Sequence, residues 1–212
     1  DKTKNQKEDT YYKIQQAQKR IAILDANKNA YKSVGMGSGI ETVMNAHIKG
    51  VHEPLAQLAD IEREYIDAIN VAMGARAYSI VVDDQDTAYR AIQILRSQGR
   101  DRASFIPLSI IKKAPTRLAI TKEKGVIDFA INLVDFDDKY TDAFYFALGE
   151  TIVVEDENCA KKLAGKYRVV TLEGDITEKS GLITGGAKKK NSSFFDKTQE
   201  RELEKYRQAL FD

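Results

Sequence analysis

A block of the sequence occurs twice, and this internal repeat constrains the fold more than any other feature. The residues of the first copy are Tyr65, Asp67, Ala68, Ala72 and Gly74, and they recur as Tyr140, Asp142, Ala143, Ala147 and Gly149. After a three-residue change in spacing, Ile80, Val81, Val82, Asp84 and Ala88 recur as Ile152, Val153, Val154, Asp156 and Ala160. Chance rarely preserves both order and identity over so many positions. The chain therefore contains two related units.

Both copies follow the same physical logic. A helix carries alanines at positions i and i+4, which let it lie close to a neighbour, and a glycine beyond the helix supplies a C-terminal stop. A hydrophobic strand follows, and then an acidic residue begins the next helix, where a carboxylate complements the N-terminal dipole. We expect two subdomains over residues 50–123 and 124–187, preceded by a linker and short helix over 35–49. Pseudo-symmetric units of this kind often join into rings when a chain dimerises.

The two ends of the sequence have the composition of amphipathic helices. Residues 11–31 contain no Gly or Pro, and their apolar residues recur seven apart. Leu203, Tyr206 and Leu210 form a matching stripe near the other end. Because a helix of this length is marginal in water without a partner, we expect residues 1–34 and 188–212 to pair as an antiparallel coiled coil. The alternative is that each helix packs separately on the globular part.

Between these ends, strands and helices alternate with uneven spacing, which favours a mixed α+β fold over a doubly wound parallel sheet. The glycines of residues 34–39 predict a break before a short helix over 40–46. Further helices are predicted over 61–72, 87–97, 139–147 and 158–165. The predicted strands are 80–82, 104–107, 152–154 and 169–172.

The charge balance and the cysteine count exclude several classes of protein. Lys and Arg total 33 against 32 for Asp and Glu, so any binding to nucleic acid must come from a local patch. A single cysteine, Cys159, cannot form an internal disulfide, and no apolar run is long enough to span a bilayer. We expect a soluble, cytoplasmic protein that has no contact with membranes.

No catalytic or metal-binding constellation is expected. The glycine-rich stretch lacks the Lys-Ser/Thr pair of a phosphate loop. Asp83, Asp84 and Asp86 lack the distal glutamate of a calcium loop, and helix capping accounts for them. His47 and His52 have no cysteines at zinc-site spacing, and two histidines give no Ser/His/Asp arrangement. We therefore expect this chain to contain no catalytic residues, metal or cofactor.

Five motifs follow one another in a fixed order. They are Gly50–Leu58, Arg102–Leu108, the two Ala/Gly blocks with their Ile-Val-Val strands, Val170–Asp175, and Gly181–Ala187 with the basic run Lys188–Lys190. Together they resemble the hinge domain of a prokaryotic structural maintenance of chromosomes (SMC) protein. The resemblance implies a non-catalytic homodimer, ring-like in shape, that joins two coiled-coil arms. It also implies ATP, Mg²⁺ and kleisin-type subunits at head domains beyond this sequence, and a role at the nucleoid in chromosome condensation and segregation.

The same resemblance implies a dimer contact near the end of the globular region. It carries over to Gly181, Thr184, Gly185 and Gly186. Glycine lets one backbone approach another closely, and exposed strand edges there can pair between subunits. The alternative is that these glycines only make turns.

A DNA contact is also implied, at the basic run where the globular region rejoins the coiled coil. It carries over to Lys188, Lys189 and Lys190, and adjacent cations of this kind neutralise phosphates without reading sequence. Lys112 and Lys113 widen the predicted patch. The alternative is that these lysines only form a solvated surface.

A second function stays open on the sequence. A nucleotide-binding α/β protein with helical extensions also contains alternating strands and helices, and it predicts a melting temperature that rises with nucleotide. The hinge predicts a stable dimer that is indifferent to nucleotide.

Overall fold

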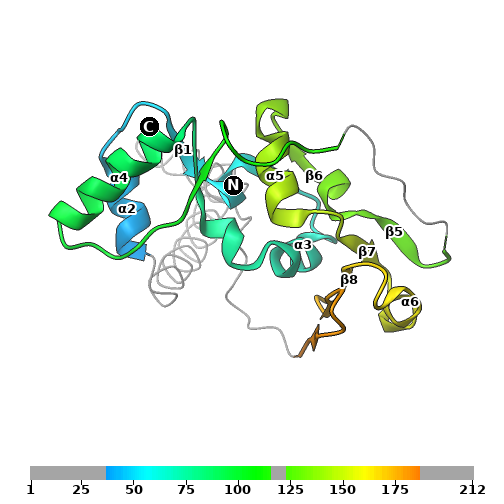
Figure 1. Cartoon of the computed structure of the whole chain (residues 1–212). Coiled ribbons are helices and arrows are strands. Elements are labelled where there is room, and N and C mark those ends of the chain that lie inside the picture. The colour runs from blue at the N-terminus through cyan, green and yellow to red at the C-terminus, as the bar shows by residue number, and fades with distance from the viewer. Residues whose placement is uncertain (1–36, 116–122, 187–212) are drawn as a thin grey trace, which may run out of the picture.

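The computed structural model describes residues 37–115 and 123–186 (Figure 1). The α-helices are α2 (Gly37–Asn45), α3 (Ile66–Met73), α4 (Gln85–Ser97), α5 (Thr141–Leu148) and α6 (Glu157–Leu163). The strands are β1 (Val51–Pro54), β2 (Ala59–Ile61), β3 (Ile80–Val82), β4 (Phe105–Pro107), β5 (Val126–Phe129), β6 (Val134–Phe136), β7 (Ile152–Val154), β8 (Val169–Thr171), β9 (Ile176–Thr177) and β10 (Ile183–Thr184). Short 3-10 helices are η1 (Leu55–Leu58), η2 (Gly74–Tyr78), η3 (Ala130–Leu133) and η4 (Asp138–Tyr140). The predicted coiled coil over 1–34 and 188–212 lies outside the described residues.

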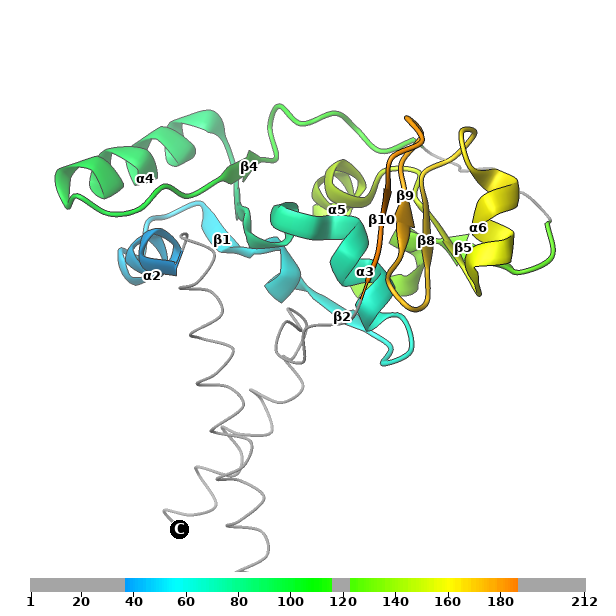
Figure 2. The same cartoon turned by 90° about the horizontal axis from the view of Figure 1, so that it is seen from below.

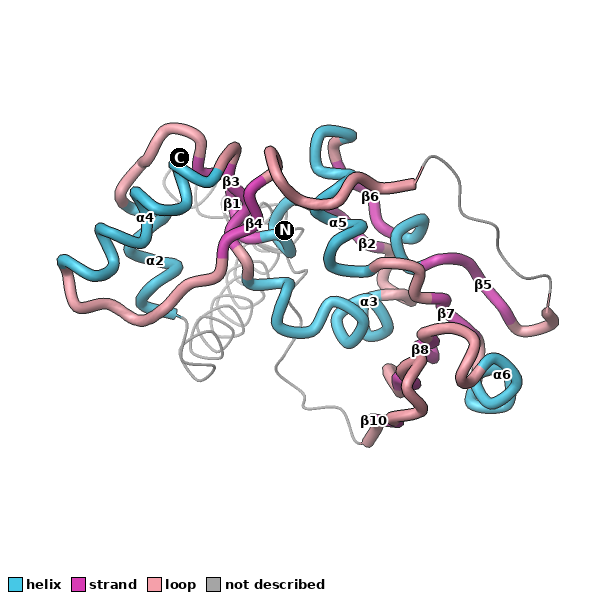
Figure 3. Tube along the Cα trace, viewed as in Figure 1, coloured by secondary structure: helices cyan, strands magenta, loops and turns pink. Residues whose placement is uncertain are grey.

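The described strands, coloured magenta in Figure 3, form three sheets that mix parallel and antiparallel pairs. One has the order β1-β3-β4, a second the order β10-β9-β8-β7-β5, and the third consists of β2 and β6. The pairs β3–β4 and β7–β8 are parallel, and the other pairs are antiparallel. The predicted α+β class is confirmed.

The two copies of the repeat fold alike, and we call residues 50–115 the first unit and residues 125–186 the second. Gly74 and Gly149 follow their helices with φ of 52° and 56°, a region that glycine adopts without a steric penalty. Asp84 and Asp156 are the N-cap residues of α4 and α6, and they have the same backbone angles, φ −148° and ψ 174°. The predicted glycine stops after α3 and α5 and the predicted acidic residues at the starts of α4 and α6 are confirmed.

Asp84 and Asp156 cap their helices in the same way. Each carboxylate accepts a hydrogen bond from the backbone N–H three residues on, at 2.8 Å from Thr87 and 2.9 Å from Cys159. These bonds are the main reason why the pKa of each aspartate lies below its ordinary value. Each cap satisfies one of the N–H groups that have no acceptor within the helix.

The structural repeat begins before the repeated residues of the sequence, which start at Tyr65 and Tyr140. The N–H of Asp83 donates to the carbonyl of Gly50 at 2.9 Å, and the N–H of Glu155 donates to that of Gly125 at 2.8 Å. These matching bonds join β3 to β1 and β7 to β5, although the two outer strands share little sequence. Each unit therefore contains an antiparallel pair followed by a parallel pair.

One predicted helix is wrong at its start. Residues 61–72 were predicted to be helical, but Ala59–Ile61 forms β2 and α3 begins at Ile66. Strand β2 pairs antiparallel with β6, with Ala59 opposite Phe136 and Ile61 opposite Val134. This pairing joins the two units, and it overrides the local preference of the sequence for helix.

The predicted break at residues 34–39 is also wrong over its described part. Helix α2 already includes Gly37 and Gly39. Glycine at position 39 serves close packing, because a Cβ there would lie 2.5 Å from the carbonyl oxygen of Asp101. The hydroxyl of Ser38 donates to the carboxylate of Asp101 at the same contact. This contact attaches α2 to the loop that follows α4.

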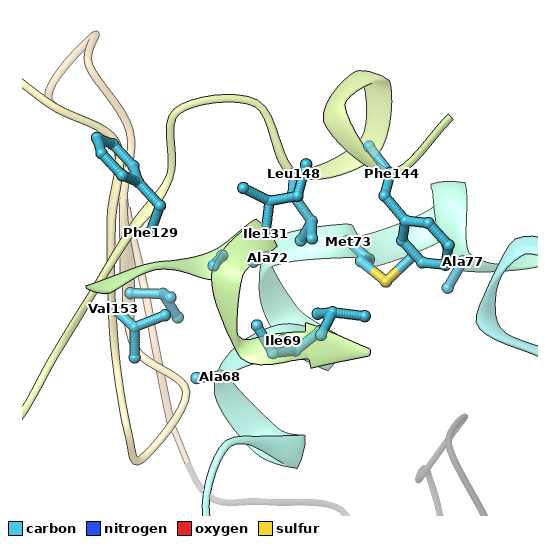
Figure 4. Packing of buried hydrophobic residues seen from close by; sticks show 14 of the residues in the cluster. Ala68, Ile69, Ala72, Met73, Ala77, Phe129, Ile131, Phe144, Leu148 and Val153 are labelled. Atoms are coloured by element: carbon cyan, nitrogen blue, oxygen red, sulfur yellow. The ribbon is translucent and has the colours of Figure 1, made fainter. Parts of the chain in front are cut away.

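The two units share their main hydrophobic core. Its buried residues come from both, and Figure 4 shows Met73 of α3 beside the Phe144 ring of α5. A smaller cluster holds α2 and α4 against β3, and includes Val43, Ile80 and Leu95. Accordingly, α3 and α5 lie centrally, with α2 and α4 at one end and α6 at the other (Figures 1 and 2). The boundary between the predicted subdomains 50–123 and 124–187 does not separate two cores.

Candidate functional site

The predicted contact residues lie in and around a hairpin of the second unit that has no counterpart among the described residues of the first. Strands β9 and β10 pair antiparallel, with Ile183 opposite Thr177 and Thr184 opposite Ile176. The turn is closed by bonds from Glu178 N–H to the Leu182 carbonyl at 2.8 Å and from Gly181 N–H to the Glu178 carbonyl at 2.9 Å. This hairpin extends the sheet beyond β8 and leaves β10 as its outermost strand.

Strand β10 and the residue just before it carry apolar side chains that the described chain leaves exposed. Leu182 is 64% exposed and Ile183 is 68% exposed. Within the described residues β10 has one neighbour, β9, so the backbone groups along its other edge have no strand partner. An edge strand with exposed Leu and Ile is a template for pairing with another chain.

The glycines of this region have different reasons to be glycine. Gly181 and Gly186 have φ of +91° and +141°, and a Cβ at either position would meet open space. Gly185 is different, because a Cβ there would collide with the carboxylate of Asp175. The same carboxylate accepts a bond from the N–H of Gly186 at 3.3 Å. The chain's own turn geometry and Asp175 therefore account for the glycines before any partner is considered.

A second open edge lies in the first unit, at β4. This strand has β3 as its one neighbour among the described residues, while its counterpart β8 is flanked by both β7 and β9. Pro107, which has no N–H to donate, is tolerated at such an edge. The position that β9 fills in the second unit is thus open in the first.

Two of the predicted DNA-binding lysines lie in described residues, in the segment that leaves β4. The ammonium of Lys113 is 2.7 Å from Asp142 Oδ2, and the N–H of Ala114 donates to Asp142 Oδ1 at 2.8 Å. The bond from Lys113, followed by that from Ala114, holds the pKa of Asp142 below its ordinary value. Lys112 is exposed and has no ion pair among the described side chains. Lys188, Lys189 and Lys190 lie outside the described residues.

A hydrogen-bonded cluster that the sequence did not indicate connects the two units. His52 Nε2 lies 2.7 Å from Asp83 Oδ1, and His52 Nδ1 lies 3.1 Å from the hydroxyl of Tyr140. Asp83 belongs to the first unit and Tyr140 to the second. The three residues are far apart in the sequence, so no local pattern could reveal the cluster. Its position points to a structural link between β1 and the start of α5.

Residues 37–115 and 123–186 contain neither a cluster of metal-ligating side chains nor a membrane-spanning helix. No group of three or more His, Cys, Asp or Glu side chains there is placed to hold a metal ion. No helix there is both long and apolar enough to cross a membrane.

Comparison with known proteins identifies one family. The protein-family model described as "SMC proteins Flexible Hinge Domain" matches residues 48–164 of this chain. Chromosome partition protein Smc of Aquifex aeolicus is 41% identical over 160 residues, which cover 74% of this chain and 14% of that protein. Its counterpart in Bacillus subtilis is 34% identical over 203 residues, 91% of this chain and 17% of that protein. An archaeal counterpart, from Methanocaldococcus jannaschii, is 40% identical over 158 residues, 73% of this chain and 13% of that protein.

Solved structures give the same result at the level of the fold. A crystal structure of an asymmetric dimer of the Geobacillus stearothermophilus SMC hinge domain matches with a TM-score of 0.72 and 30% identity, over 94% of this chain and 84% of that one. The Pyrococcus furiosus Smc hinge domain with an extended coiled coil matches with a TM-score of 0.67 and 29% identity, over 96% and 74% of the two chains. The chain spans a small part, 14% to 17%, of the Smc proteins of Aquifex aeolicus and Bacillus subtilis.

Proposed function

Because this chain belongs to the flexible hinge domain family of SMC proteins, we propose that it forms a homodimer that joins the coiled-coil arms of two SMC subunits. The observation that carries the proposal is the pair of open sheet edges, β10 in the second unit and β4 in the first. The similar hinge of Geobacillus stearothermophilus is itself described as an asymmetric dimer. The hinge is a non-catalytic module.

The repeat supports a specific way of pairing the two edges. In the second unit, β9 occupies the side of β8 that corresponds to the open side of β4. We propose that β10 of one subunit approaches β4 of the other and fills the place that has no strand in the first unit. A two-fold axis then creates the same contact twice, so the dimer closes and uses β4 and β10 of both chains. Association buries Leu182 and Ile183, which gives the contact an apolar centre.

The proposed role in the cell follows from joining two arms. An SMC protein with this hinge would hold its arms together at one end and act at the nucleoid in chromosome partition. ATP, Mg²⁺ and kleisin-type subunits would belong to head domains, which lie outside the part of an SMC protein that this chain represents. The hinge contributes the mechanical connection.

The oligomeric state of the purified chain tests this function. Sedimentation equilibrium at micromolar concentrations is expected to show a reversible dimer, and added ATP is expected to leave both the dissociation constant and the melting temperature unchanged. A folded chain that stays monomeric at tens of micromolar, on the order of ten times a typical 1 μM dissociation constant, would rule out the dimerisation hinge. A nucleotide-dependent rise in melting temperature would instead favour the nucleotide-binding alternative.

We propose that the hinge also contacts DNA, through the basic run Lys188–Lys190 together with Lys112. The exposed ammonium of Lys112 supports this, because no described side chain neutralises it. Lys113 contributes less positive field, since Asp142 is its ion-pair partner.

Lys112→Gln tests the DNA contact at a described residue. Binding to a random-sequence DNA duplex is expected to weaken, because binding then releases one counterion fewer. The slope of log affinity against log salt concentration is expected to decrease in magnitude by about 1. Fluorescence anisotropy across a salt series measures both. Lys161→Gln is the control, since Lys161 is an exposed lysine on α6 that already pairs with Glu157. An unchanged salt slope for Lys112→Gln would remove this residue from the DNA contact.

A further inference from the structure

The side chain of Arg168 connects three elements that are distant in the sequence. Its Nε donates to both carboxylate oxygens of Glu178 at 3.0 Å. Its Nη1 donates to the backbone carbonyl of Ala72 at 2.9 Å and to Thr151 Oγ1 at 2.8 Å. Glu178 follows β9 in the turn of the hairpin, Ala72 lies in α3 of the first unit, and Thr151 directly precedes β7.

These contacts have the features of strong polar interactions. The side chains of Arg168 and Glu178 are 22% and 37% exposed, so water and salt screen the pair less than an ion pair on the open surface. The carbonyl of Ala72 is in the last turn of α3, where helix carbonyls have no intrahelical donor and a cation is favoured. Thr151 is fully buried, and its hydroxyl also donates to the carbonyl of Leu148.

The repeat allows Arg168 to be compared with the residue at the equivalent position of the first unit. Ser104 occupies the equivalent position in the first unit, because Ile80 N–H donates to the Ser104 carbonyl as Ile152 N–H donates to that of Arg168, both at 2.9 Å. Ser104 precedes β4, which is an edge, and Arg168 precedes β8, which continues into β9 and β10. The arginine therefore occurs in the copy that carries the hairpin, and the other copy has a short neutral side chain.

We infer that Arg168 is a positioning residue for the β10 edge. By bonding Glu178 on one side and Ala72 and Thr151 on the other, its guanidinium fixes the hairpin relative to both units before association. An edge that is already ordered loses less conformational freedom when it pairs, which strengthens binding without a new contact. This inference rests on the proposed dimer, and Arg168 acts from within its own chain.

Arg168→Gln and Glu178→Gln test the inference. Each removes a charge-assisted interaction, so the dimer dissociation constant is expected to rise about tenfold. Hydrogen exchange of the amides of residues 176–184 is expected to accelerate in monomer at low concentration, which a contact with the partner would not cause. The double variant is expected to have the same dimer dissociation constant as Arg168→Gln, because both changes break the same ion pair. Arg168→Lys is expected to recover only part of the affinity, since an ammonium lacks the planar fork.

A matched control and the contrary outcomes complete the experiment. Lys161→Gln breaks an exposed ion pair with Glu157 on α6. It is expected to change neither the dimer dissociation constant nor the amide exchange of residues 176–184. If the wild-type chain dimerises and Glu178→Gln leaves its dissociation constant unchanged, the inference fails while the proposed function stands. If the wild type is monomeric, the proposed function itself fails. Should Arg168→Gln not fold, Glu178→Gln decides, because it keeps the bonds of Arg168 to Ala72 and Thr151.

Discussion

Leu182→Glu combined with Ile183→Glu is expected to yield a folded monomer. Both side chains are mostly exposed in the described chain, so glutamates there leave the core untouched. On association each carboxylate would be buried without a partner, which costs several kcal/mol. The dissociation constant should therefore rise by at least about 100-fold, and sedimentation velocity over a dilution series measures it. Circular dichroism verifies that the fold is retained.

Tyr89→Glu is the matched control for this edge. Tyr89 lies on α4 and is 64% exposed, the same fraction as Leu182, and it belongs to neither β10 nor β4. Its substitution is expected to leave the dimer intact. A dimer that persists at wild-type affinity in the double glutamate variant would show that β10 is not the contact, even if the chain still dimerises.

The sequence indicated residues of this hairpin but not its exposed apolar side chains. The resemblance pointed to Gly181, Thr184, Gly185 and Gly186. Leu182 and Ile183 lie between them and look like ordinary core residues. Their exposure follows from the position of β10 at the outer edge of a sheet, and a strand this short has no alternation of apolar and polar residues that would reveal it.

Features encoded locally could be predicted, and features that depend on distant partners could not. The acidic caps Asp84 and Asp156 act on N–H groups three residues away, so the repeat was sufficient to predict them. Strand β2 and the cluster of His52 with Tyr140 depend on residues of the other unit. The helix predicted over 61–72 included Ile61 of β2, and no sequence pattern linked His52 to Tyr140.

Glycine was the residue most easily misinterpreted. The run before residue 40 was interpreted as a helix break, yet Gly39 is buried inside α2. The absence of a Cβ permits contact with the backbone at Asp101, and this packing offsets the low helix propensity of glycine, about 1 kcal/mol relative to alanine. Whether a glycine ends a helix or permits close packing depends on its tertiary neighbour.

Phe144→Ala is expected to cause the largest loss of stability of any single substitution considered. Phe144 is fully buried, and its ring stacks on that of Phe136 with centroids 4.3 Å apart. Removing it leaves a cavity in the core that both units share, which typically costs about 3–5 kcal/mol of unfolding free energy. Since small proteins are stable by only about 5–15 kcal/mol, the midpoint of urea unfolding should fall markedly. Circular dichroism and tyrosine fluorescence, at fixed protein concentration, would follow the transition.

Phe146→Ala provides the comparison on the same helix. Phe146 is 48% exposed, and the Arg76 guanidinium lies 5.7 Å from its ring centroid. Such an exposed contact contributes about 0.5–1 kcal/mol, so this variant should lose far less stability than Phe144→Ala. Because the main core contains residues of both units, circular dichroism and tyrosine fluorescence should report the same single unfolding transition in each variant. Two separate transitions, or equal losses for the two phenylalanines, would contradict a core that the units hold in common.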